Sequence, residues 1–196
     1  MTSEETTVAE LDERAWADAI GMYERRYTYA KVTGRDHADW ALDVDRLMRG
    51  DTPDVRGWRV NDPLAGEFER LDDPYYPFAL RPDAARTDAW KYHLDEIPRS
   101  SAKRFLVALS TLWLNVEDTP EFEERREDLE RRAEVILSRF PEGSSRFYAN
   151  TGSESARLDY YKRISGCDPI SVHDWDLGLF LVSDTEVGMV WSFHAW

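Results

Sequence analysis

The most chemically suggestive run in the sequence is His173-Asp174-Trp175-Asp176, which brings an imidazole and two carboxylates together. With His194 at the far end of the apolar run that follows, His173, Asp174 and Asp176 define a candidate polar site. Such groups suit Zn, Mn or Fe, or a small-molecule enzyme or binder. In a strand, however, His173 and Asp174 point to opposite faces, so the competing interpretation is a loop that leads into a strand with a core tryptophan.

The other patterns that resemble catalytic motifs are better explained by structure. Ser100-Ser101-Ala102-Lys103 matches the S-x-x-K nucleophile motif, but the companion S-D-N and K-T-G elements are absent from the sequence, which favours a helix cap. Cys167 has no second cysteine to pair with. The histidines show no H-x-x-x-H spacing, and the sequence contains no Gly-rich phosphate loop. The sequence therefore assigns no catalytic residue, no metal and no cofactor, and we lean towards a protein that is not an enzyme.

The charge balance restricts the possible partners. The 196 residues include 25 basic and 39 acidic side chains, for a formal net charge of −14 at pH 7. Binding to nucleic acid or to an anionic membrane needs clustered Lys and Arg, so we expect neither, and a basic protein is the compatible partner. The N-terminus is acidic and polar, and the longest strongly apolar stretch, 105–114, is too short for a bilayer. We therefore expect a cytoplasmic protein.

Three aspartates could form a surface that attracts such a partner. Asp36, Asp39 and Asp43 are spaced i, i+3 and i+7 in a helix predicted over 36–49, which would place them on one face. Exposed carboxylates accelerate the encounter with a basic protein. The sequence thus predicts an acidic partner-binding face, although a solvated helix surface gives the same pattern.

Two tyrosines could anchor the same partner. Tyr75 and Tyr76 lie between Pro74 and Pro77, in a segment whose prolines exclude a central strand. Tyrosine offers a large contact area at low entropic cost, so both residues are candidate partner-binding residues if the segment is exposed. The alternative is that they cover the edge of the core.

Hydrophobic periodicity predicts an α+β fold. Helices are expected over 7–33, 36–49, 83–97, 102–116 and 120–140. A strand over 145–150, a helix over 151–164 and two strands over 175–182 and 186–193 are expected to follow. We therefore expect a single domain, 1–196, with a mainly helical part, 1–144, packed on a small, largely antiparallel C-terminal sheet of β-α-β-β order, 145–196.

The closing run DWDLGLFLVSDTEVGMVW resembles the hairpin that ends small bacterial proteins of uncharacterised or toxin-immunity type. The quoted run covers about a tenth of the chain, and the resemblance implies no functional residue. Together with the charge, it favours a non-enzymatic acidic interaction protein, most concretely an immunity-type inhibitor of a basic toxin or nuclease. The alternatives are a small-molecule enzyme or binder at His173, Asp174 and Asp176, and an acidic DNA mimic. The sequence leaves the oligomeric state open.

Overall fold

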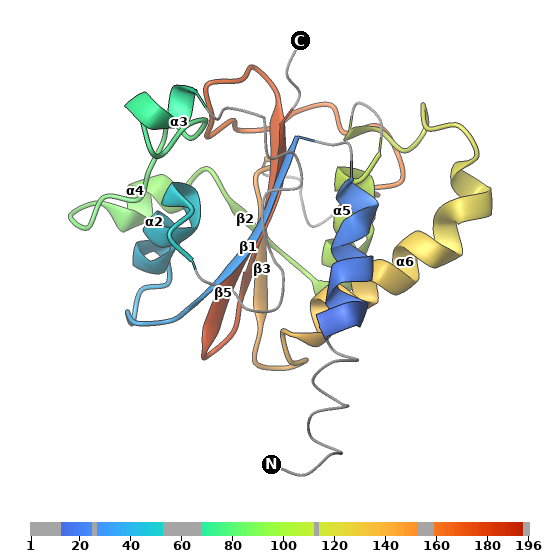
Figure 1. The fold of residues 1–196 in the computed structure, drawn as a ribbon, viewed down its shortest axis with the longest axis horizontal. Coiled ribbons are helices and arrows are strands. Elements are labelled where there is room, and N and C mark those ends of the chain that lie inside the picture. The colour runs from blue at the N-terminus through green and yellow to red at the C-terminus, as the bar shows by residue number, and fades with distance from the viewer. Residues whose placement is uncertain (1–12, 25–26, 53–67, 112–113, 153–158, 194–196) are drawn as a thin grey trace.

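The computed structural model describes residues 13–24, 27–52, 68–111, 114–152 and 159–193 (Figure 1). Within them, five strands form one antiparallel sheet in the order β1-β5-β4-β3-β2. The strands are β1 (Thr28–Gly34), β2 (Asp95–Ile97), β3 (Arg146–Ala149), β4 (Asp176–Val182) and β5 (Glu186–Phe193). The fold is therefore α+β, and the hairpin predicted from the last two apolar runs is present as β4 and β5.

Helices cover both faces of this sheet. Figure 1 shows the sheet nearly edge-on, with α5 (Arg99–Leu109) and α6 (Phe122–Ser138) on one side and α2 (Ala41–Arg49), α3 (Glu69–Asp72) and α4 (Thr87–Lys91) on the other. The helical residues 13–20 and the 3-10 turn η1 (Gly21–Tyr23) pack with α5 and α6. The described residues include no helix long and apolar enough to cross a membrane.

The two central strands separate two apolar cores. Leu179 and Leu181 of β4 pack against α5 and α6, whereas the alternate residues Phe180 and Val182 pack on the side of α2 and α4. Every residue of β4 is buried, because helices cover both faces of the sheet and leave no solvated side. This arrangement explains why β4 reads as a continuous apolar run rather than as an alternating one.

A close approach between β4 and β5 requires glycine at 178. Gly178 lies opposite Trp191 in the hairpin register. A Cβ at this position would lie 2.0 Å from Cδ2 and Cε3 of the Trp191 indole, which is far inside van der Waals contact. The missing side chain therefore makes the space in which the buried tryptophan lies flat against β4.

The sheet is not confined to residues 145–196, because two strands come from the part expected to be mainly helical. The helix expected over 7–33 gives way to β1, whose seven residues pair with β5. β-Branched and aromatic residues in β1 favour a strand once that partner is present. The helix expected over 83–97 is reduced to α4 and is followed by β2, where Pro98 favours extended backbone at Ile97. Of the helix expected over 151–164, residues 153–158 lie outside the described residues, and residues 159–164 form a turn and irregular backbone instead of a helix.

Candidate functional site

The three aspartates expected on one helix face lie in different surroundings. α2 begins at Ala41, so Asp36 and Asp39 precede it. Asp36 pairs with Arg46 at 2.5 Å, and Asp39 pairs with Lys91 at 2.8 Å. Burial alone would raise the pKa of Asp39, but hydrogen bonds from Lys91 and Thr87 outweigh it and hold the pKa below its ordinary value. Both carboxylates are therefore compensated within the chain.

Asp43 is fully buried and does not contribute to an exposed face. Its carboxylate accepts hydrogen bonds from the backbone N–H groups of Asp36 and His37, at 3.1 and 3.4 Å, and lies 2.6 Å from His37 Nδ1. It thus holds the turn that leads from β1 into α2. The prediction that the three aspartates share one helix face is wrong, because α2 begins at Ala41 and not at residue 36.

Tyr75 and Tyr76 are half-buried beside α2 and α3. The Tyr75 hydroxyl donates to Asp45 Oδ1 at 2.8 Å, and this hydrogen bond, with some burial, raises the pKa of Tyr75. The guanidinium of Arg81 lies 4.2 Å from the centre of the same ring. Arg70 donates to the carbonyl of Tyr76. These contacts tie the segment to the body of the protein, so its tyrosines are not free anchors.

The polar residues expected near 173 do not converge on one site. Asp174 is exposed, His173 is half-buried among aromatic rings, including Tyr27 and Phe193, and Asp176 is fully buried. Burial lowers the pKa of His173 and keeps its imidazole neutral near pH 7. His194 lies outside the described residues. Among the described residues, no group of three His, Cys, Asp or Glu side chains is placed to hold a metal ion.

Asp176 has a structural setting instead. Its Oδ2 accepts the backbone N–H groups of Ile170 and Ser171, at 3.2 and 2.8 Å, and its Oδ1 accepts from Asn150 Nδ2 at 2.9 Å. Burial raises the pKa of Asp176 despite these hydrogen bonds. Cys167 lies close by, and burial raises the pKa of its thiol to about 11, so the thiol stays protonated. This cluster organises the loop before β4.

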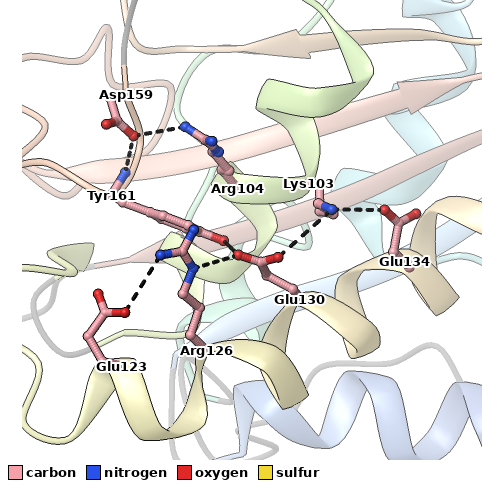
Figure 2. Close-up of polar contacts among 8 residues, drawn as sticks. All are labelled: Lys103, Arg104, Glu123, Arg126, Glu130, Glu134, Asp159 and Tyr161. Atoms are coloured by element: carbon pink, nitrogen blue, oxygen red, sulfur yellow. Dashed lines mark hydrogen bonds and ion pairs between the residues drawn. The ribbon is translucent and has the colours of Figure 1, made fainter.

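A second charged cluster joins α5 to α6 (Figure 2). The Tyr161 ring lies between Arg104 and Arg126, whose guanidinium carbons are 5.3 and 4.9 Å from the ring centre. The Tyr161 hydroxyl and Arg126 Nε both donate to Glu130 Oε1, at 2.9 and 2.8 Å. Arg104 pairs with Asp159 at 3.2 Å. Because these cations and carboxylates satisfy one another, the cluster stabilises helix packing and offers little to a ligand.

The best candidate site is a cavity of about 490 Å³ where the β4–β5 turn approaches the N-terminal end of α2. We call it the hairpin-end pocket. The described residues with charged or aromatic side chains that line it are Arg35, Trp40, Lys91, Arg146, Tyr148 and Asp184. Three cations thus face one carboxylate, although the whole chain carries a large negative charge.

Arg35 is the most unusual residue of the hairpin-end pocket. Its guanidinium donates to the backbone carbonyls of Ser183, His37 and Ala38, at 3.2, 3.1 and 2.7 Å. Its Nε is buried without a hydrogen-bond partner, and no carboxylate of the described residues lies within salt-bridge distance of it. The arginine is therefore fixed in position while its positive charge remains uncompensated.

The other two cations differ in how firmly they are held. Lys91 is paired with Asp39 at 2.8 Å and is only partly exposed. Arg146 has 69% of its side chain exposed, hydrogen-bonds to Tyr148 and lies 3.8 Å from Glu96 Oε2. An exposed ion pair at that distance contributes little to stability, so Arg146 can turn towards a ligand at small cost.

Sequence reasoning missed the hairpin-end pocket completely. Its lining residues come from the end of β1, from α4, from β3 and from the β4–β5 turn, which are far apart in the chain. No short motif links them, and strand order alone brings them together. The one local signal was Arg35, an arginine directly after the glycine that ends β1.

No protein-family model, curated protein or solved structure matches this chain. The geometry of the described residues therefore carries the functional argument.

Proposed function

We propose that this protein is a non-enzymatic binding protein whose hairpin-end pocket takes an anionic group of its ligand or partner. The observation that carries the proposal is the uncompensated charge of Arg35, held in the pocket wall by three backbone carbonyls. A cation without a carboxylate partner attracts an anion, and an arginine that is already ordered loses little side-chain entropy on binding it.

The strong negative charge of the whole chain does not oppose this proposal. At physiological ionic strength charges are screened over about 8 Å, so the nearest side chains dominate the potential inside a pocket. Those side chains are Arg35, Arg146 and the Asp39-paired Lys91, with Asp184 as the opposing carboxylate. The distant acidic surface instead disfavours anions that cannot enter the pocket.

The test is a titration with inorganic phosphate at constant ionic strength, followed by backbone amide NMR signals. We expect shifts at residues 183–186 and at Arg35. Arg146→Glu should weaken binding about tenfold, as expected when a cation beside an anion is reversed. Arg163→Glu makes the same charge change at an exposed residue outside the pocket and should leave binding unchanged. Amide signals that stay unchanged up to about 10 mM phosphate would contradict the proposal. A dissociation constant of that size corresponds to a binding free energy of only about −3 kcal/mol.

The immunity-type inhibitor of a basic toxin or nuclease remains the second proposal. The net charge of −14 supports it. Many cations of the described residues pair with carboxylates of the same chain, so the acidic side chains in excess remain to attract a basic partner. An inhibitor of this kind should associate with its basic partner more slowly as salt rises. Association that is insensitive to salt would reject it.

A further inference from the structure

We infer that the hairpin-end pocket binds a small aromatic anion, that is, a flat ring that carries a phosphate or a carboxylate. This inference rests on the proposed binding function. Two features of the pocket lead to this ligand class. One is a rigid aromatic pair in the wall, and the other is the placement of two arginines beside that pair.

The aromatic pair is Trp40 and Tyr148. Their rings are stacked, with centroids 4.8 Å apart and planes inclined by 19°. Trp40 is fixed from other sides by Trp90 and Phe180, with centroids at 6.0 and 5.7 Å. Tyr148 is only half-buried and lines the cavity. A half-exposed ring that is held flat by a buried one offers a surface on which a planar ligand can stack.

The arginines lie beside this surface. Arg146 and Tyr148 are two residues apart on β3, so their side chains project from the same face of the sheet. Arg35 lines the same cavity from the end of β1. A guanidinium group matches the geometry of carboxylates and phosphates. Arg146 can offer two parallel N–H donors, whereas Arg35 already donates to three backbone carbonyls and contributes its positive charge. An acid group between the arginines would therefore leave its ring over the aromatic pair.

The volume of the pocket points the same way. About 490 Å³ falls within the range of roughly 300–1,000 Å³ that small-molecule sites occupy. A single inorganic anion would leave most of that space to water. A ring of one or two fused cycles with its acid group uses both the charge and the volume.

A ligand series tests this inference on the full chain. The probes are inorganic phosphate, phenyl phosphate, 1-naphthyl phosphate, benzoate and phenol, and the readout is the indole N–H signal of Trp40, assigned with Trp40→Phe. We expect phenyl phosphate to bind about tenfold more tightly than inorganic phosphate and phenol, and 1-naphthyl phosphate more tightly again. Comparison of benzoate with phenyl phosphate then decides between carboxylate and phosphate as the acid group.

Variants locate the two contacts. Tyr148→Leu should reduce the gain from the ring while leaving the affinity for inorganic phosphate within about twofold. Arg146→Glu should weaken both phosphates about tenfold, and the control Arg163→Glu should change neither. The probe series itself is measured on the unsubstituted protein, so a folding defect in Tyr148→Leu does not remove the test.

The outcomes separate this inference from the proposed function. Equal affinities for inorganic phosphate and phenyl phosphate would overturn the aromatic ligand and leave an anion-binding pocket. Phenol binding as tightly as phenyl phosphate would overturn the anionic part of the ligand. Binding of neither anion would overturn both proposals together.

Discussion

Replacing Gly178 by alanine should destabilise the protein strongly through one contact. The new Cβ would lie 2.0 Å from two atoms of the Trp191 indole. Trp191 is fully buried and packs against Phe180, with ring centroids 5.1 Å apart, so the indole cannot move without displacing other core rings. Overpacking of this kind costs about 1–3 kcal/mol and occasionally more, and we expect about 3 kcal/mol because the clash is with a rigid ring.

The assay is urea denaturation, with the free energy of unfolding taken from the midpoint at constant m-value. The matched control is Gly34→Ala, at the end of β1, where an added Cβ meets no atom within 4 Å. That variant should change stability by less than about 1 kcal/mol. In a Trp191→Leu background the ring is gone, and the cost of Gly178→Ala should fall below about 1 kcal/mol. Equal midpoints for wild type and Gly178→Ala would refute the close approach.

The remaining predictions concern buried polar and apolar groups. Asp43→Ala should cost about 1–3 kcal/mol in urea denaturation because it removes a buried carboxylate that accepts hydrogen bonds from the backbone N–H groups of Asp36 and His37, whereas Asp36→Ala should change stability by less than about 0.5 kcal/mol. Leu109→Ala, at a fully buried position of α5, should cost about 2–5 kcal/mol, and an unchanged midpoint would mean that this helix is peripheral. The hydrogen bond from Arg126 lowers the pKa of Glu130. The stabilisation that the ionised Glu130 carboxylate provides is therefore complete above the pKa of about 4.3 in the unfolded chain, and it is lost as pH falls through the folded pKa. The urea midpoint of Glu130→Gln should consequently fall less steeply than that of the wild type as pH is lowered.

Much of the fold could be predicted because its signals are local. The run of residues that became β4 and β5 is apolar on both sides of a short polar turn, and α6 shows an apolar stripe over many turns. Gly50 ends α2 with a left-handed backbone, as its position after the apolar stripe indicates. These features depend on neighbours in sequence, so no knowledge of the tertiary structure was needed.

The edge strands could not be predicted in the same way. The buried residues of β1 follow a pattern that is compatible with both the helical and the strand period. Only its pairing with β5 makes it a strand. The short β2 has three residues and no pattern of its own. Strand formation depends on a partner that lies far away in the chain, so local propensity decides little.

The candidate sites show the same division. Composition and spacing alone established an acidic chain without a catalytic motif, and they drew attention to Asp36, Asp39 and Asp43 as a surface. Only the tertiary structure decided that Asp43 is buried and that the carboxylates of Asp36 and Asp39 are compensated. It likewise placed Arg35, which has no carboxylate partner among the described residues, in the hairpin-end pocket, because the sheet order brings the ends of β1, β3 and the β4–β5 turn to one place. Charge can be counted in a sequence, but whether a charge is paired depends on distances that only the folded chain sets.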